Sequence, residues 1–258
     1  MNNQESFFYK YRTIDKRHID RARRIFTHNE LYFSSKNQLN DPFDCKFGYS
    51  FAASDEEIRR YFWRSLERNR PNWNRNKKRR WIAERRDMIK RHDPELERKL
   101  VKGTEQIISE IGICSLTRLP DDILMWSHYA DAHKGFCIKL HDDEKEWCIA
   151  RAQKIKYSKQ YPIVNPITDD DLTRLEKTLL TKSKNWEYEQ EWRIIDHEKK
   201  PGIQRFPQHL LVGVIFGCRM SEDHKGLIRE WCANRKTSIS FYQAREASGT
   251  YSLDIIKI

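Results

Sequence analysis

A run of carboxylates that ends in an arginine, at residues 187–193, carries the side chains most suggestive of chemistry. It reads Glu-Tyr-Glu-Gln-Glu-Trp-Arg, and alternate residues of a β-strand share one face. The side chains predicted to share that face are Glu187, Glu189, Glu191 and Arg193. Neighbouring carboxylates repel each other when ionised, unless a cation or a substrate lies between them. The face is therefore either the edge of an active site or a solvated polar surface with one Glu–Arg pair.

A second group, at residues 125–135, gathers aromatic and hydrogen-bonding side chains in the order Met-Trp-Ser-His-Tyr-Ala-Asp-Ala-His-Lys-Gly. Aromatic rings with polar tips suit a planar ligand such as nicotinamide or a nucleobase. The residues of interest are Trp126, His128, Tyr129 and His133. The alternative is a packed loop with Trp126 as its core anchor. The two histidines are five positions apart, not the four that place a metal-binding pair on one helix face. We therefore expect no metal ion here.

A third group lies near the N-terminus. Residues 9–12, Tyr-Lys-Tyr-Arg, end a short predicted strand, where Arg12 could bind a phosphate group through two hydrogen bonds. Residues 40–44, Asn-Asp-Pro-Phe-Asp, predict a turn, because a residue that precedes proline avoids the helical conformation. Asp41 and Asp44 are best explained as turn residues that bond to the backbone.

Positive charge is concentrated in one stretch of the chain. The 258 residues include 49 Lys and Arg and 38 Asp and Glu, a net charge of +11. Residues 56–102 hold 17 of the basic and 8 of the acidic residues, so this stretch carries +9 and the rest of the chain +2. Such a segment is the electrostatic footprint expected for nucleic acid. The predicted contact residues are Arg59, Arg60, Arg64, Lys77, Lys78, Arg79, Arg80, Arg85 and Arg86.

The composition excludes several classes of protein. No apolar run approaches the roughly 18 residues of a membrane span, and no secretory signal is recognisable. The six cysteines form no C-x-x-C pair, which favours reduced thiols without a structural zinc site. The motifs of P-loop NTPases, Rossmann dehydrogenases, zincins and α/β-hydrolases are absent. We expect a cytoplasmic protein that does not contact a membrane.

Short strands and helices alternate along the chain and must position these groups. Strands are predicted at residues 7–12, 31–34, 112–117, 135–140, 149–157, 186–195, 210–216, 238–244 and 252–258. Helices are predicted at residues 13–29, 121–130, 168–182 and 221–234, and in three pieces within 55–111. Ser54 and Glu57 form a predicted capping box. We therefore predict one α+β domain over residues 1–258, with a mixed or antiparallel sheet and a basic helical insertion at 55–111.

Several short motifs, occurring in order, make the sequence resemble a widespread bacterial family of unknown function. They are residues 9–12, 31–34, 40–44, 125–129, 133–135 and 189–193. Members of that family are often associated with abortive infection and phage defence. The resemblance spans most of the chain but skips the basic stretch. It implies a toxin or defence effector, with an antitoxin or another defence protein as a partner.

The order of elements is also distantly similar to the ADP-ribosyltransferase fold, which has a first-strand cation and a late strand bearing Glu-x-Glu. By that resemblance, Arg12 holds the phosphate or ribose of NAD. Glu191 is then the catalytic carboxylate, and Glu189 orients the acceptor. The candidates for the middle motif of that fold, a Ser-Thr-Ser run or a tyrosine, are Ser34, Ser115 with Thr117, and Tyr129. The other side chains expected at the NAD site are Trp126, His128, His133 and Arg193.

We therefore expect a mono-ADP-ribosyltransferase-like protein that uses NAD as substrate and needs no metal. A fixed carboxylate near the ribose would stabilise the positive charge that develops as nicotinamide leaves. The basic helices would recruit the acceptor, DNA or RNA. One alternative is a nuclease or other phosphodiesterase whose Mg²⁺ is bound by the three glutamates of residues 187–191 with Asp41 or Asp44. Another is a non-catalytic protein that binds nucleic acid or a partner protein.

Overall fold

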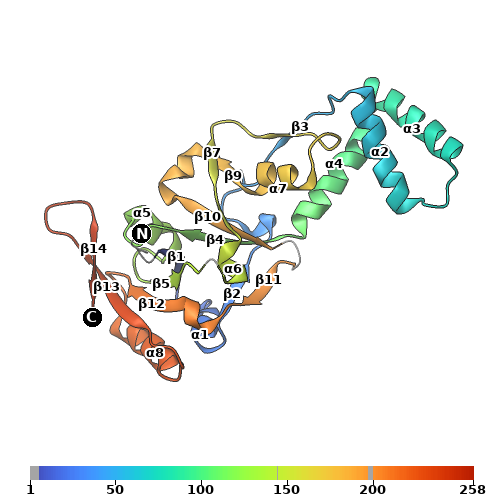
Figure 1. Cartoon of the computed structure of the whole chain (residues 1–258). Coiled ribbons are helices and arrows are strands. Elements are labelled where there is room, and N and C mark those ends of the chain that lie inside the picture. Colours follow the sequence, from blue (N-terminus) through green and yellow to red (C-terminus); the bar gives the residue numbers. More distant parts are fainter. Residues whose placement is uncertain (1–5, 144, 197–199) are drawn as a thin grey trace, which may run out of the picture. The chain divides into compact units, whose positions relative to one another are not determined.

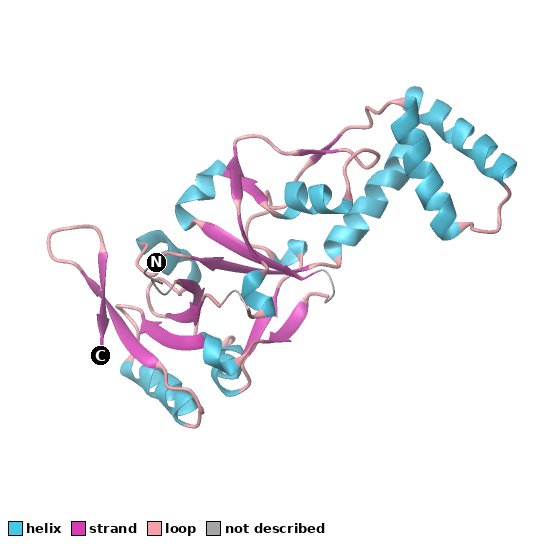
Figure 2. Ribbon diagram, viewed as in Figure 1, coloured by secondary structure: helices cyan, strands magenta, loops and turns pink. Residues whose placement is uncertain are grey.

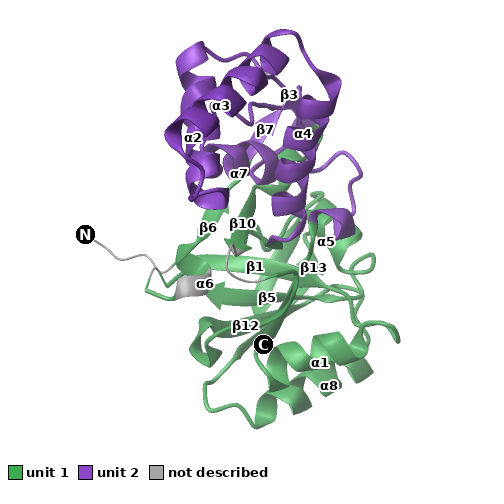
Figure 3. Cartoon of the chain, turned by 90° about the vertical axis from the view of Figure 1, so that its right-hand side faces the viewer, with its two compact units in different colours: residues 1–35, 112–155, 185–258 green, residues 36–111, 156–184 purple. Residues whose placement is uncertain are grey.

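The structure, a computed structural model, describes residues 6–143, 145–196 and 200–258 (Figure 1). The chain divides into two compact units, which Figure 3 distinguishes by colour. Unit 1 comprises residues 1–35, 112–155 and 185–258, and unit 2 comprises residues 36–111 and 156–184. The predicted insertion at 55–111 therefore lies within unit 2, which also includes sequence on either side of it.

An eight-stranded sheet forms the centre of unit 1 (Figure 2). Its strands are β1 (Phe7–Arg12), β4 (Gly112–Thr117), β5 (Phe136–His141), β6 (Ala152–Lys154), β10 (Glu191–Asp196), β12 (Leu211–Phe216), β13 (Ser240–Glu246) and β14 (Leu253–Lys257). Their order across the sheet is β14-β13-β12-β5-β1-β4-β10-β6. Neighbouring strands are antiparallel except β12 and β13, which are parallel. A separate antiparallel pair joins β2 (Glu30–Phe33) to β11 (Gly202–Arg205). The predicted α+β class with a largely antiparallel sheet is confirmed.

Apolar side chains pack on both faces of this sheet. On one face, α1 (Ile19–Thr27) and α8 (Glu222–Ala233) contribute Ile25 and Ile228 to a cluster that includes Phe8 of β1. On the other face, α5 (Ile123–Tyr129) contributes Trp126 to a cluster that includes Tyr11 of β1. Phe8 and Tyr11 are three positions apart on one strand, which is why their side chains point to opposite faces. Short helices α6 (Trp147–Ala150) and η3 (Gln208–Leu210) complete the unit.

The sheet is incompletely paired between β1 and β4. β1 is paired with β5 along its whole length, but with β4 at one register position, Tyr9 opposite Thr117. Lys10 lies where the two strands diverge, and its Nζ donates a 2.6 Å hydrogen bond to the carbonyl oxygen of Ser115. Burial, together with the nearby charge of Arg12, lowers the pKa of Lys10 to about 8. A buried lysine thus links the two parts of the sheet where backbone pairing stops.

Unit 2 consists mainly of four helices: α2 (Asp55–Asn69), α3 (Arg75–Lys90), α4 (Pro94–Ser109) and α7 (Asp171–Leu179). Their N-caps, which each accept a backbone N–H bond, are Ser54, Asn74, Asp93 and Asp170. The predicted capping box of Ser54 with Glu57 is confirmed. The apolar cluster of the unit consists of Ile58, Phe62, Leu66, Ile82, Ile89, Leu96 and Ile167. The smaller elements are η1 (Lys36–Gln38), β3 (Gly48–Tyr49), β7 (Lys156–Ser158), β8 (Ile163–Val164) and β9 (Thr181–Ser183).

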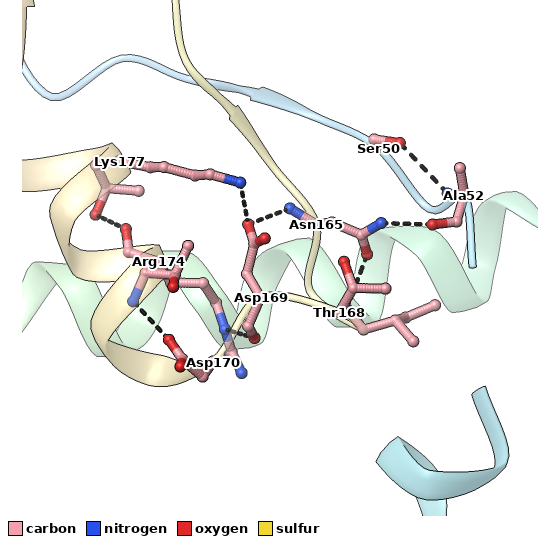
Figure 4. A network of polar contacts seen from close by, with 11 residues as sticks. Ser50, Ala52, Asn165, Thr168, Asp169, Asp170, Arg174 and Lys177 are labelled. Atoms are coloured by element: carbon pink, nitrogen blue, oxygen red, sulfur yellow. Dashed lines mark hydrogen bonds and ion pairs between the residues drawn. The ribbon is translucent and has the colours of Figure 1, made fainter. Parts of the chain in front are cut away.

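A polar network in residues 165–170 joins the two segments of unit 2 (Figure 4). The Asn165 side-chain amide donates a 2.7 Å hydrogen bond to the carbonyl oxygen of Ala52. The Asp169 carboxylate accepts the backbone N–H of Asn165 at 2.8 Å and lies 2.7 Å from Nζ of Lys177. This loop therefore fixes α7 to the chain that leads into α2, and both helices belong to one structural unit.

Three predicted elements differ from the structure described so far. The helix predicted at 168–182 ends at Leu179, because Thr181–Ser183 form β9. The helix predicted at 13–29 begins only at Ile19, because Asp15 accepts the backbone N–H groups of Arg17 and His18 in a turn. The strand predicted at 149–157 begins with the last two residues of α6 and then divides into β6 and β7, which belong to different sheets. Within the described ranges, we find no helix of sufficient length and hydrophobicity to cross a bilayer.

Candidate functional sites in the two units

The acidic segment does not form the continuous strand that its alternation predicted. Residues Lys184–Glu189 form a 3₁₀ helix, η2, and β10 begins at Glu191. Gln190 joins the two in the left-handed conformation, with φ of 43°, and its N–H donates to the Glu187 carbonyl oxygen at 3.2 Å. Glu187 is exposed, whereas Glu189 and Glu191 are buried. The predicted shared face of three carboxylates is wrong, because a tight turn separates the first two from the strand that carries the third.

Glu191 and Arg193 do share a face, and they form a buried ion pair. Nε of Arg193 lies 2.7 Å from Oε1 of Glu191, and Nη2 lies 3.3 Å from Oε2. Their side chains are 4% and 1% exposed, respectively. A guanidinium fork that meets both carboxylate oxygens is among the strongest ion-pair geometries in proteins. The predicted Glu–Arg pair is thus confirmed, but in a desolvated setting rather than on a solvated surface.

β4 adds polar residues to the same face of the sheet. The register places Thr117 opposite Glu191 and Ser115 opposite Arg193. Oγ1 of Thr117 also donates a 2.7 Å hydrogen bond to the carbonyl oxygen of Glu189. This bond secures the turn before β10 to the neighbouring strand.

Glu189 links this face to α5. The Tyr129 hydroxyl donates a 2.6 Å hydrogen bond to Oε1 of Glu189, which is 2% exposed. His128 contacts the ring of Trp186 edge-on, with centroids 6.2 Å apart. The structure therefore gathers part of the predicted NAD site in unit 1. We refer to Ser115, Thr117, Tyr129, Glu189, Glu191 and Arg193 as the sheet-face cluster.

Trp126 of α5 packs against His133 of the turn that follows the helix. Trp126 is fully buried, and its Nε1 donates a 2.9 Å hydrogen bond to the Pro120 carbonyl oxygen. The alternative in which it anchors the core is confirmed. The His133 ring stacks on Trp126, and its Nε2 lies 3.1 Å from Oγ of Ser127. Burial lowers the pKa of His133. The turn is strained, because three successive non-glycine residues, 131–133, have φ values of 48°, 49° and 69°.

Arg12 lies apart from the sheet-face cluster. Because Tyr9 is opposite Thr117, the alternation of β1 places Arg12 on the other face of the sheet, the face of Lys10. Arg12 is half-buried, its burial lowers the pKa of its guanidinium, and its Nε has no hydrogen-bond partner in the described part of the chain. The structure thus does not bring Arg12 to the same face as Glu191.

Ser34 and the residues best placed to bind a metal also lie outside the sheet-face cluster. Ser34 forms an isolated backbone bridge with Ile113 at the edge of β4. In the described ranges, Asp143, Glu146 and His209 have ligand atoms within 4.8 Å of one another. None of these three was predicted as a catalytic residue.

In unit 2, α2 and α3 with the turn between them, residues 55–90, form what we call the basic arm. Five residues of the predicted contact set are exposed and have no carboxylate partner within the part of the chain that the structure describes. They are Arg59, Arg64, Lys77, Arg79 and Arg80. The arm therefore presents positive charge that its own fold does not neutralise.

Four other predicted contact residues are placed differently. Lys78 is 8% exposed, because it lies one turn before Ile82 on the buried face of α3; its place in an exposed contact set is corrected. The other three have carboxylate partners: Arg60 with Glu56, Arg85 with Glu84, and Arg86 with Asp55 and Asp87, at N–O distances of 2.8, 2.8, 3.6 and 2.9 Å.

Three further arginines, Arg68, Arg70 and Arg75, are exposed but were not predicted as contact residues. On α2, Arg60, Arg64 and Arg68 follow one another at intervals of four residues, opposite the buried Ile58 and Phe62. Residues with this spacing lie on one face of a helix. The i, i+4 spacing of arginines was therefore the signal that identifies Arg68.

Comparison with known families gives one match to this chain. Residues 125–194 match the model of a family described as a protein of unknown function, DUF2971. The matched region includes most of α5, the turn after it and most of β10, and so it carries Tyr129, Glu189, Glu191 and Arg193. The basic arm and Arg12 lie outside it. Neither a curated protein nor a solved structure matched significantly.

Proposed function

We propose that this protein binds nucleic acid through the basic arm. The proposal rests on one observation, the exposed arginines and lysines of α2 and α3 that have no carboxylate partner in the described structure. Arg64 and Arg68 are one turn apart, a spacing at which like charges destabilise a helix by about 0.2–0.5 kcal/mol. Basic side chains near a helix N-terminus are unfavourable, because they lie at the positive end of the helix dipole. The first turn of α3 contains no acidic residue that would offset them.

A polyanion would relieve this repulsion. Each phosphate that a lysine or arginine neutralises releases condensed counterions, which makes binding favourable and dependent on salt concentration. The arm's cations are spread over two helices rather than gathered in a pocket, so an extended anion fits them better than a small one. Nucleic acid is the polyanion that matches a strongly basic helical segment.

Charge reversal on the arm tests this function directly. Binding of a fluorescently labelled duplex is measured by polarisation for the wild type and for Arg64→Glu/Arg68→Glu/Arg79→Glu. The matched control, Lys236→Glu/Arg245→Glu/Lys257→Glu, changes the net charge equally but uses exposed residues of unit 1. We expect the arm variant to lose at least about 100-fold in affinity and the control to lose much less. Equal losses, or no binding by the wild type, would contradict the proposal.

ADP-ribosyl transfer from NAD at the sheet-face cluster is the second candidate. It is favoured by the meeting of Tyr129, Glu189 and Glu191, which the resemblance assigns to the substrate and acceptor sites. In this proposal the Glu191 carboxylate would exchange one of its contacts with Arg193 for a ribose hydroxyl and stabilise the developing positive charge. The placement of Arg12 on the opposite face weighs against the phosphate-holding role that the resemblance gives it.

Release of nicotinamide from labelled NAD tests this candidate. We expect Glu191→Gln to reduce the release by at least about 100-fold, while Glu187→Gln, at an exposed position of the same segment, leaves it nearly unchanged. Circular dichroism of both variants shows whether the fold persists. Absence of nicotinamide release by the wild type would rule the candidate out. The nuclease alternative is not carried forward, since it rested on the shared face of three carboxylates.

A further inference from the structure

Building on the proposed nucleic-acid binding, we infer that the basic arm binds the phosphodiester backbone alone, and that its tryptophans support cations instead of stacking on bases. Proteins that bind single strands commonly stack bases on exposed aromatic rings. The arm contains Trp63, Trp73 and Trp81 among its basic residues, so the composition alone leaves both modes open. The contacts of the three indole rings distinguish between them.

Each of the three indoles has a cation of α3 over its ring, and two of these cations lie within 4.3 Å of the ring centroid. Nζ of Lys77 lies 4.3 Å from the centroid of the Trp73 ring, and Cζ of Arg85 lies 4.1 Å from that of Trp81. At these distances the negative face of an aromatic ring attracts the cation and restricts its side chain. The indole face that a base would need is occupied by the protein's own positive charge.

Trp63 has a hydrogen bond in addition to its more distant cation. Its Nε1 donates a 2.6 Å hydrogen bond to Oε1 of Glu67, one turn further along α2. Nζ of Lys78 lies over its ring at 5.8 Å from the centroid. The polar edge and one face of this ring are therefore already in use.

All three rings are also half-buried against the apolar cluster of unit 2. The Trp81 ring meets Phe62 of that cluster edge-on, with centroids 5.5 Å apart. A ring packed on the core on one side and covered by a cation on another cannot receive a base without losing one of these contacts. The indoles are thus best understood as a platform that holds Lys77 and Arg85 in place.

This arrangement specifies the chemistry of the partner. The exposed groups that remain for contact are ammonium and guanidinium ions, whose partners in nucleic acid are phosphate oxygens. Affinity should then follow the number and density of phosphates and should be insensitive to base sequence. A duplex, with the denser phosphates, should bind more tightly than a single strand of the same length.

The test compares three ligands of equal length: a duplex, one of its strands, and that strand with every base removed but the phosphodiester backbone intact. We expect the duplex to bind most tightly, and the two single strands to bind equally within about twofold. Stacking would instead make the base-bearing strand bind at least about fivefold more tightly for each stacked base. That result would overturn the inference while leaving nucleic-acid binding in place. Failure of all three ligands to bind would overturn both.

Two variants give an independent readout. Lys77→Gln should reduce the slope of log affinity against log salt by about 0.9 on the duplex. Trp73→Leu should leave that slope unchanged and should weaken the base-bearing and abasic strands to the same small extent. If Trp73→Leu weakens the base-bearing strand selectively, Trp73 stacks on a base and the inference is wrong.

Discussion

The two units treat their charged residues in opposite ways. In the sheet-face cluster, Glu191 and Arg193 are buried, and each meets the other's charge through a bidentate contact. In the basic arm, Arg64 and Arg68 are exposed, one turn apart, and have no carboxylate partner in the described part of the chain. The first arrangement neutralises charge within the fold, and the second leaves it for another molecule.

This difference shows that the local density of charge is a poor guide to its role. Each charge of a buried ion pair is compensated by the other charge of the pair. Removing one of them therefore leaves an uncompensated buried ion. A solvated cation contributes little to stability, and its removal is felt mainly by whatever it binds. Substitutions in the sheet-face cluster should therefore mainly reduce stability, and substitutions in the basic arm should mainly reduce binding.

The largest expected effect on stability comes from breaking the buried pair. Arg193→Met should lower the free energy of unfolding by about 3–5 kcal/mol, because it removes the guanidinium that contacts both oxygens of the buried Glu191 carboxylate. Urea unfolding followed by tryptophan fluorescence measures the loss, and Arg64→Met on the arm is the matched control. The double variant Glu191→Gln/Arg193→Met should recover part of the loss. A loss as small as that of the control would mean that the pair is solvated.

A pH-dependent effect is expected from Lys10. Its pKa is about 8 in the folded state and 10.5 in the unfolded chain, so between these values the unfolded chain binds more protons. Stability should therefore rise with pH across that window, by on the order of 3 kcal/mol in total. The urea midpoints of the wild type and of Lys10→Met, measured at the two ends of the window, isolate this contribution. Parallel pH profiles for the two proteins would contradict a buried, destabilised ammonium group.

A smaller loss is expected for the link between α5 and Glu189. Tyr129→Phe removes the hydroxyl that donates to the Glu189 carboxylate and should reduce stability by about 2 kcal/mol. The same measurement on Tyr251→Phe, whose side chain is 99% exposed, provides the baseline for losing a phenol hydroxyl. Equal values for the two variants would show that the bond to Glu189 contributes nothing.

The smallest effect on stability is expected in the arm. Arg64→Ala/Arg68→Ala should change the free energy of unfolding by no more than about 0.5 kcal/mol, since it removes two exposed side chains and the repulsion between them. The same variant should bind a duplex more weakly. A marked loss of stability would show that these arginines have a structural role, and the contrast between the two regions would fail.

The sequence predicted most elements of the fold because their signals are local. The capping box at Ser54 and the acidic entry to α7 mark helix starts through bonds within a few residues. The continuous strand predicted at 187–193 is wrong, because a left-handed residue at Gln190 is compatible with the same alternating pattern. Alternation alone does not distinguish a strand from a 3₁₀ turn followed by one.

The candidate sites were predictable to different degrees. The pairing of Glu191 with Arg193 followed from i, i+2 spacing on a strand. The face on which Arg12 lies did not, since it depends on the register between β1 and β4, which joins residues more than 100 positions apart. In the arm, the charge was evident from composition. Which of these residues are exposed depends on the face of its helix on which each one lies. Lys78 lies on the buried face of α3, whereas Arg68 lies on an exposed face of α2.

The salt dependence of binding tests the central claim most directly. Affinity for a duplex is measured over a range of salt concentrations for the wild type, for Arg64→Ala/Arg68→Ala and for the control Arg245→Ala/Lys257→Ala. If the arm's unpaired cations bind phosphates, the arm variant should lose about 0.9 in log–log slope for each cation removed, and the control should keep the wild-type slope. An unchanged slope in the arm variant, or an equal change in the control, would contradict the claim.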